Sequence, residues 1–229
     1  MAAPSAGILA SDLAVGSIVK LMEGGVATEY LVVNQGKPSG SSLYDASCDG
    51  TWLLRKDIKE NRQFNSTQNN DYANSTIHSY LNNDFFNMYS SVEKSAIKQV
   101  KIPYCSGLTG GVISSGSNGL LAYVFLLGAY EVGWNNSMQP YFPTDGVCLS
   151  YFNGASETDN KRISNLNGYA SGWWLRSKVA VDTIRTIFTE KTGGYSSAFS
   201  DDSHGIRPSV ILKSTSKFDE NTLVLKGVA

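Results

Sequence analysis

Two arginines set beside large apolar residues constrain the fold of this chain more than any other feature. Arg176 belongs to the stretch Gly172-Trp173-Trp174-Leu175-Arg176-Ser177, and Arg207 belongs to Gly205-Ile206-Arg207-Pro208. An arginine keeps its charge when it is buried, so the fold must supply a carboxylate or several carbonyl oxygens to its N–H donors. We therefore expect the two arginines to frame the polar and aromatic segment 178–204 that lies between them.

The sequence leaves the partners of these arginines open. The acidic residues that could hold one of them are Asp57, Glu60, Asp71, Glu131 and Asp159. Trp173 and Trp174 are neighbours in a predicted strand and face opposite ways, so core packing is favoured over stacking of both rings on a sugar. The residues to which we assign structural roles are Trp173, Trp174, Arg176, Arg207 and Pro208.

Composition places the chain among folded globular proteins and excludes several classes of function. Its 229 residues are 41% hydrophobic and 17% charged, which is enough apolar material for a real core. A net charge of −1 and a pI near 6.1 argue against nucleic-acid binding. No apolar run is long enough to span a bilayer, and the first residues lack the features of a signal peptide. We expect synthesis in the cytoplasm and no membrane insertion.

Histidines and cysteines are too few and too scattered to suggest an active site. The histidines are His78 and His204, and the cysteines are Cys48, Cys105 and Cys148, without zinc-ligand spacing. His204 follows two aspartates and a serine, but a polar loop explains that cluster as well as a catalytic role does. We predict no catalytic residues, no metal and no cofactor.

The local patterns predict strands at both ends of the chain. Two apolar runs flank Gly24-Gly25 and indicate a hairpin over residues 18–33. The further strands that we expect cover residues 51–55, 120–127, 147–152, 173–176, 183–189 and 207–212.

Two adjoining helices are predicted between these strands. Ile77, Leu81 and Phe85 recur at helical spacing after Asn74 or Ser75, either of which can cap the first helix. Ser90-Ser91-Val92-Glu93 has the form of a capping box, which would open a second helix that continues to about Val100.

Several of these stretches resemble one family when they are taken in order. They are Tyr80-Leu81-Asn82-Asn83-Asp84-Phe85, Glu93-Lys94-Ser95-Ala96-Ile97, Phe125-Leu126-Leu127 with Glu131-Val132, Gly172 to Ser177, and Gly205 to Pro208. The series is similar to the domain-of-unknown-function family 6273, which is common in gut Firmicutes and in their phages and prophages. Lys178 stands where the family usually has a proline, which leaves the local turn open and fits a tolerant position. The family has no established enzymatic activity.

The closing section also resembles the C-type-lectin-like fold of formylglycine-generating-enzyme relatives and of the variable proteins of diversity-generating retroelements. That resemblance implies an α+β, C-type-lectin-like fold with two adjoining helices packed on a mainly antiparallel twisted sheet with long loops. We expect an N-terminal arm over residues 1–15, a single domain over residues 16–213 and a C-terminal tail over residues 214–229.

The function expected from these resemblances is non-enzymatic binding by a phage virion protein at the tail tip. Its ligand would be a host cell-surface protein or glycan, its neighbours other virion proteins, and its assembly a homotrimer. Alternatives are a capsid or tail decoration protein and, less favoured, a carbohydrate-active enzyme. The ligand-binding candidates lie within residues 178–204 because loops on a rigid scaffold commonly carry binding residues. They are Val181, Asp182, Thr183, Arg185, Tyr195, Ser197, Phe199, Asp201, Asp202 and His204.

Overall fold

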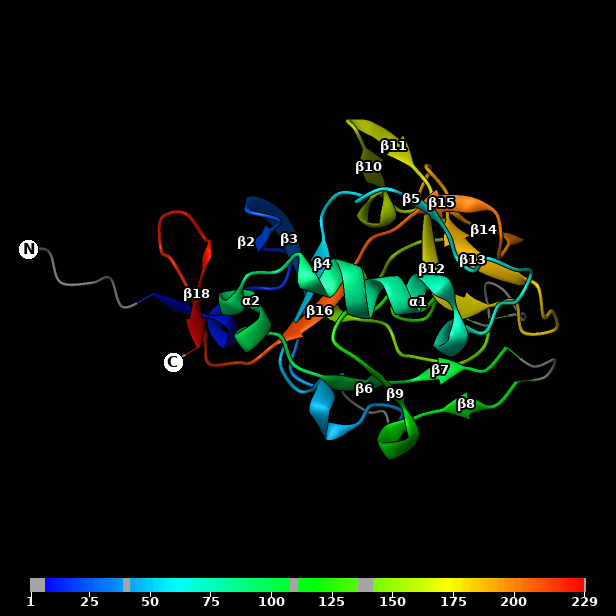
Figure 1. Ribbon diagram of the computed structural model, residues 1–229, viewed down its shortest axis with the longest axis horizontal. Helices are drawn as coiled ribbons and strands as arrows, with labels where there is room; N and C mark the ends of the chain where they lie inside the picture. Colours follow the sequence, from blue (N-terminus) through cyan, green and yellow to red (C-terminus); the bar gives the residue numbers. More distant parts are fainter. Residues whose placement is uncertain (1–6, 39–41, 108–110, 136–141, 229) are drawn as a thin grey trace, which may run out of the picture.

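The chain folds mainly into β-sheets, and the two larger sheets follow one another along the molecule (Figure 1). The computed structural model describes residues 7–38, 42–107, 111–135 and 142–228. Strands make up 36% of the described residues and helices 17%. The two larger sheets have five and four strands, and smaller sheets lie around them.

The five-stranded sheet carries the first arginine motif. Its strands, in spatial order, are β14 (Tyr195–Phe199), β13 (Arg185–Thr189), β12 (Trp173–Lys178), β15 (Ser203–Gly205) and β5 (Asn61–Gln63). Neighbours pair antiparallel except β12 and β15, which run parallel with Trp173 opposite Gly205. Residues 179–202 therefore form one hairpin with its flanking loops at the edge of this sheet, while Lys178 ends β12 and residues 203–204 begin β15.

The four-stranded sheet is antiparallel throughout and contains the predicted N-terminal hairpin. Its strands are β16 (Ser209–Leu212), β4 (Thr51–Arg55), β3 (Val26–Gln35) and β2 (Ile18–Glu23). Gly24 and Gly25 form the turn with φ of 56° and 84°, which glycine adopts without steric cost. The expected strands at 18–33, 51–55 and 207–212 are thus confirmed, although the last is shorter and begins at Ser209.

The second arginine motif lies where the chain passes from one large sheet to the other. Residues 205–209 run from β15 to β16, while residues 55–60 run alongside from β4 to β5. Backbone hydrogen bonds bridge the gap, 2.8 Å from Arg55 N to Pro208 O and 2.9 Å from Lys59 N to Ile206 O. Residues 205–208 and residues 55–60 are therefore joined by a ladder of backbone hydrogen bonds, which connects the two large sheets.

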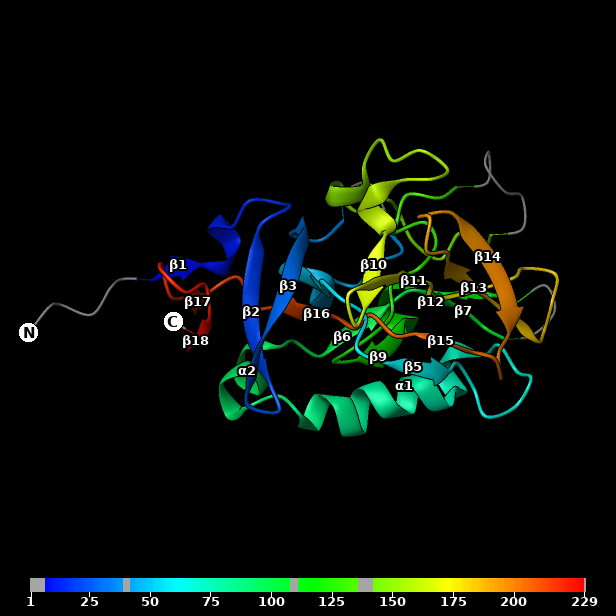
Figure 2. The same cartoon turned by 90° about the horizontal axis from the view of Figure 1, so that it is seen from above.

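Four smaller sheets complete the β-structure of the described residues. They are β1 (Ile8–Leu9) with β17 (Ser216–Phe218) and β18 (Leu225–Val228), β10 (Ser164–Leu166) with β11 (Tyr169–Ser171), β6 (Val100–Ile102) with β9 (Leu120–Ala122), and β7 (Tyr104–Cys105) with β8 (Ile113–Ser114). Residues 8–9 of the expected N-terminal arm thus pair with the expected C-terminal tail, and both lie at the end of the molecule opposite β14 (Figures 1 and 2).

The first predicted helix is confirmed and the second is much shorter than predicted. α1 (Thr76–Tyr80) begins after Ser75, whose hydroxyl accepts from His78 N at 3.2 Å, and it continues as a π-helical turn over Leu81–Phe85. α2 covers only Ser91–Ala96, and Val100 lies instead in β6, opposite Ala122. The apolar spacing after Ser90 predicted a helix through Val100. The helix ends earlier because Val100 pairs with Ala122 in a strand, which the spacing cannot show.

The predicted α+β, C-type-lectin-like fold is therefore wrong. Strand residues are about twice as common as helical ones, and no pair of adjoining helices packs on a sheet in the described residues. The strand predicted at 147–152 is also wrong, since that stretch contains a 3₁₀ turn over Ser150–Phe152. The apolar run 120–127 is a strand only to Ala122, beyond which a single bridge joins Phe125 to Ser209.

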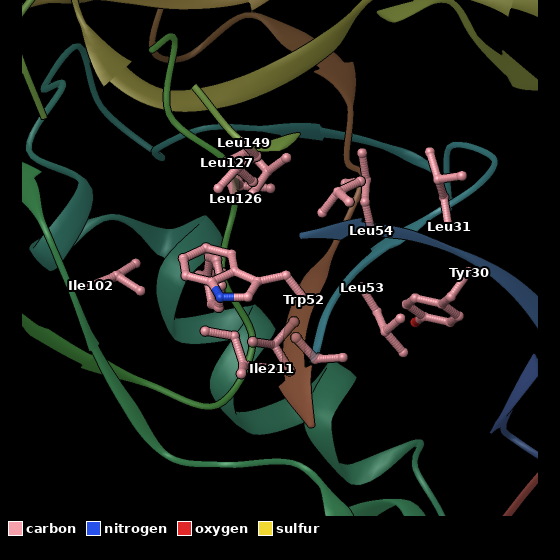
Figure 3. Close-up of a cluster of buried hydrophobic side chains, with 14 of the residues drawn as sticks. Tyr30, Leu31, Trp52, Leu53, Leu54, Ile102, Leu126, Leu127, Leu149 and Ile211 are labelled. Carbon is pink, nitrogen blue, oxygen red and sulfur yellow. The ribbon is translucent and has the colours of Figure 1, made fainter. Parts of the chain in front are cut away.

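A single apolar core extends beneath both large sheets. Figure 3 shows part of it, with Trp52 between the leucines of β4 and the chain at Leu126 and Leu127. The Trp52 ring meets Tyr44 and Phe125 edge to face, with 5.6 Å between ring centroids in both pairs. Edge-to-face ring pairs stabilise a core by more than the burial of their apolar surface alone. No described helix is long and apolar enough to cross a membrane.

Candidate functional site

The rigid base of the candidate site is Arg176, which satisfies all its donors inside the core. Nη1 and Nη2 bond the two carboxylate oxygens of Glu131 at 2.5 Å and 2.7 Å. The remaining N–H groups bond the carbonyl oxygens of Pro103, Leu126 and Asp145 at 2.8 to 3.0 Å. Both side chains of the ion pair are 0% exposed. Of the five acidic candidates for Arg176, the structure selects Glu131.

A second carboxylate lies beside this ion pair. The Ser177 hydroxyl is 2.9 Å from both carboxylate oxygens of Asp145, and the same hydroxyl accepts from Ala129 N. Burial raises the pKa of Asp145 to about 6, against the opposing effects of Arg176 and the Ser177 hydrogen bond. The strand β12 is thus fixed to residues 126–131 and to Asp145 by charge-assisted hydrogen bonds as well as by apolar packing.

Arg207 is buried, and its hydrogen bonds to the described residues go to carbonyl oxygens and not to a carboxylate. Its Nε bonds the carbonyl oxygens of Arg55 and Lys56 at 2.8 Å and 3.1 Å, and its guanidinium lies 4.9 Å from the centroid of the Trp173 ring. Nη1 has no hydrogen-bond partner among the described residues. Burial lowers the pKa of Arg207 to about 10. Arg207 is therefore held by carbonyl oxygens, whereas Arg176 is held by a carboxylate and by carbonyl oxygens.

The tryptophans and Lys178 lie inside the protein. Trp173 and Trp174 are both 0% exposed and donate their indole N–H to Arg162 O at 2.9 Å and to Arg62 O at 2.8 Å. Lys178 is the last residue of β12 and is also buried, and burial lowers its pKa. The expectation of a tolerant position just past the motif is wrong, because the side chain at 178 belongs to the interior.

The hairpin of β13 and β14 presents a row of the predicted contact residues on one face. Arg185 pairs with Phe199, and Tyr195 lies opposite Thr189 at the other end. Because side chains alternate along a strand, Arg185, Tyr195, Ser197 and Phe199 share that face. The Arg185 guanidinium lies 4.8 Å from the Phe199 ring centroid, while the Tyr195 ring packs 5.1 Å from Phe142.

The loop before β13 adds three more candidates at the same end as Arg185. Val181 and Thr183 are exposed, and Asp182 is partly buried because its carboxylate accepts from Ile184 N at 2.7 Å. The amide of buried Asn70 holds the loop from below through the carbonyl oxygens of Asp182 and Arg185, at 2.9 Å and 2.8 Å. The loop is therefore anchored at its base while its tip faces solvent.

The aspartates after β14 have backbone roles. Asp202 accepts from Phe199 N at 3.0 Å, and the Asp201 carbonyl accepts from the Gln63 side chain at 2.7 Å. Together they close the turn between β14 and β15. Asp202 still reaches solvent, so this turn extends the exposed surface near Phe199.

His204 belongs to the opposite face of the sheet from Arg185. Its ring stacks on Phe188, with centroids 3.9 Å apart and planes at 19°, and meets Trp174 edge to face. Trp174 and Phe188 are paired across β12 and β13, which fixes the face that all three rings share. Of the ten predicted residues, four therefore lie on one face of the sheet, His204 lies on the other, and five lie in the flanking loops.

A hollow of about 340 Å³ opens beside His204, and we name it the Gly172 hollow. Its lining residues are Ala170, Ser171, Gly172, Phe188, Glu190, Lys191, Thr192 and His204. Of these, only His204 was predicted from the sequence. Phe188 could not be predicted, because its place in the lining depends on its pairing with Trp174 across β12 and β13, and the sequence does not reveal how two strands align. A second hollow, of about 300 Å³, lies between Thr183 and the chain near Asn69.

Both histidines pack against aromatic rings, and two of the three cysteines are buried. His78 Nδ1 lies 3.3 Å from the Asn82 side chain, while the His204 ring contacts Phe188 and Trp174 and lines a hollow with Ser171 and Thr192. Cys48 and Cys105 are buried thiols, and burial raises the pKa of Cys48 to about 12. In the part of the chain that the structure describes, no three potential metal ligands gather.

The described residues form a β-sheet domain. Its apolar core encloses buried arginines, and a partly exposed hairpin lies at one end. The chain belongs to the family described as Domain of unknown function (DUF6273), whose model matches residues 49–214. The family predicted from the sequence is confirmed, and the match includes both arginine motifs and the whole segment 178–204. No curated protein and no solved structure matches the chain.

Proposed function

We propose that this protein is a non-enzymatic binding module that presents residues 178–204 to its ligand. The observation that carries the proposal is the exposed end of the β13–β14 hairpin, where Val181, Thr183, Arg185 and Phe199 lie together. This end combines an apolar side chain, a hydroxyl, a cation and an aromatic ring. Such a mixture suits contact with a protein or glycan surface.

The support beneath this surface favours binding with little ordering cost. Asn70 fixes the loop before β13, and the bidentate pair of Arg176 and Glu131 fixes the strand behind it. A surface that is already ordered loses less conformational entropy when a partner docks. The same rigidity would let the exposed side chains change without disturbing the core.

The biological setting that we propose is the tail tip of a phage particle, with a host surface protein or glycan as the ligand. Other virion proteins would be its neighbours, and the copies would assemble as a trimer. This setting is supported by the family resemblance alone, whereas the binding role is supported by the exposed hairpin. The two parts of the proposal therefore require separate tests.

The binding role is tested with purified protein and intact cells from a panel of Gram-positive gut bacteria. The variant Val181→Asp/Arg185→Glu changes two exposed side chains, and it leaves the aromatic packing of Tyr195 intact. We expect cell binding to fall at least about tenfold, which corresponds to about 1.4 kcal/mol. Unchanged binding by the folded variant would exclude this end of the hairpin as the contact surface.

A matched control makes the same changes of charge far from the hairpin. Val26→Asp/Lys213→Glu replaces two exposed residues near the opposite end of the molecule. We expect its cell binding to equal that of the wild type. Equal losses in both variants would mean that net charge, and not the hairpin surface, governs binding.

A further inference from the structure

We propose that the Gly172 hollow binds one saccharide ring. This assignment rests on the proposed binding function, and it adds a class of ligand and a second contact region on the sheet face opposite Arg185. It is carried by the shape of the hollow, by the aromatic pair at its floor and by the charges at its rim.

Gly172 makes room for the floor of the hollow. A Cβ atom at this position would lie 2.7 Å from Thr189 O and 3.1 Å from the Phe188 ring. The ring of Phe188, from β13, therefore leans over the bare backbone of residue 172 and meets His204, from β15, at 3.9 Å between centroids. The two strands that flank β12 thus supply a stacked pair of rings to the lining of the hollow, which we call its floor.

Buried Trp174 holds this floor in place. Its ring meets Phe188 at 5.9 Å and His204 at 4.7 Å between centroids, both edge to face, and its indole N–H is satisfied by Arg62 O. Burial lowers the pKa of His204, so the imidazole is neutral at pH 7. A neutral, fixed aromatic surface suits the C–H face of a sugar ring, which gains from apolar contact without carrying charge.

The rim offers hydrogen bonds of both kinds. Glu190 and Lys191 are adjacent and exposed, and the Thr192 hydroxyl lies 3.4 Å from the Glu190 carboxylate. A carboxylate only accepts and an ammonium only donates, whereas each sugar hydroxyl can do either. A ligand with a single charge would be attracted by one of these residues and repelled by the other. A neutral polyhydroxylated ring can use both.

The size of the hollow limits the ligand to about one ring. Its volume of about 340 Å³ is near the lower end of ligand pockets, which range from about 300 to 1,000 Å³. Tyr169, on the β10–β11 hairpin, is 81% exposed and directly precedes Ala170 of the lining in the chain. A longer glycan could therefore continue past the first ring along this side of the protein.

The test is saturation-transfer NMR on the intact protein with free monosaccharides, namely glucose, galactose, mannose, rhamnose and N-acetylglucosamine. We expect at least one to bind with a Kd on the order of 1 mM, which corresponds to about −4 kcal/mol. Lys191→Met/Thr192→Val should weaken that binding at least about fivefold. Both changed residues are exposed, so the variant is expected to fold.

Tetramethylammonium chloride serves as the cationic competitor in this experiment. If the hollow instead takes a cation on its aromatic floor, tetramethylammonium will bind, and the loss of Lys191 will strengthen its binding by removing repulsion. That result would overturn the saccharide assignment. Absence of all sugar binding, or sugar binding that the Lys191→Met/Thr192→Val variant retains in full, would overturn it as well.

The hairpin variant Val181→Asp/Arg185→Glu separates this proposal from the general binding function. We expect it to bind monosaccharides as the wild type does, because residues 181 and 185 do not line the hollow. Wild-type protein that binds cells but no sugar would refute the saccharide site and leave the binding function standing. Wild-type protein that binds neither would refute both.

Discussion

Arg176 and Glu131 face each other in the core through two parallel hydrogen bonds, 2.5 Å from Nη1 to Oε2 and 2.7 Å from Nη2 to Oε1. Arg176 belongs to β12, which pairs with β13 of the β13–β14 hairpin, while Glu131 comes from a stretch without regular secondary structure. Their pairing makes the ordering of residues 126–131 a condition for the ordering of β12. The hairpin therefore depends on a contact between residues that are far apart in the chain.

Glu131→Gln should destabilise the protein strongly. The substitution leaves the Arg176 charge buried without its counter-charge, and the expected loss is about 3–5 kcal/mol in the free energy of unfolding. Urea denaturation measures it. The control is Glu29→Gln, which breaks an ion pair with Lys56 of 2.6 Å whose side chains are 43% and 47% exposed. That change should cost less than about 1 kcal/mol, and equal losses would refute the structural role of the buried pair.

His78→Gln should reduce the acid sensitivity of folding. Burial lowers the pKa of His78 to about 4, whereas the unfolded chain takes up this proton near the ordinary histidine pKa of 6.5. The unfolded state thus binds more protons between these values, and the wild type loses stability as the pH falls from about 6.5 to about 4. The free-energy difference between wild type and variant should change by up to about 3 kcal/mol across that range. A constant difference would contradict the buried, neutral imidazole.

Asp145→Asn should show the opposite pH dependence. Burial raises the pKa of Asp145 to about 6 from the ordinary aspartate pKa of 3.8, so the folded state binds the extra proton between these values. Stability due to Asp145 is present in full below about pH 3.8 and is lost as the pH rises through about 6. Relative to the variant, the wild type should therefore weaken by up to about 3 kcal/mol over this range, as denaturation curves at successive pH values would record. A difference of the other sign would mean that Arg176 outweighs the desolvation of Asp145.

Gly172→Ala should cost about 1–3 kcal/mol because the new methyl group overlaps backbone and ring atoms. The closest of these atoms, Thr189 O, cannot move without disturbing the pairing of β12 and β13. Gly194→Ala is the matched control, since its nearest neighbour is a Glu190 carboxylate oxygen at 3.4 Å. Thermal unfolding should separate the two variants, and a Gly172→Ala protein as stable as the wild type would show that the Phe188 ring can retreat.

Local features of the fold could be predicted from the sequence because they depend on neighbouring residues. The glycine pair at 24–25 determines its own turn, and Ser75 caps α1 through an N–H three residues away. Val100 shows where this reasoning ends, because its strand exists only through pairing with residues near Ala122. A helical spacing of apolar residues cannot reveal a partner that lies elsewhere in the chain.

The candidate site could be located as a segment but not as a surface. The exposed positions near Arg185 were found because polar and aromatic residues stand between two apolar motifs. The Gly172 hollow was missed because its floor is assembled from β13 and β15 across β12, and the parallel pairing of Trp173 with Gly205 has no local signature. Choosing Glu131 among five acidic residues required the same kind of long-range contact.

The small sheet of β1, β17 and β18 brings residues 7–9 and 225–228 to one pole of the molecule, and the β13–β14 hairpin lies at the other (Figures 1 and 2). Copies held together by these terminal strands would all direct their hairpins outward. A ligand array that meets several hairpins at once is then held by avidity, since each further contact forms at a high effective concentration. A binding site with low affinity in a single copy would in this way hold a multivalent ligand tightly.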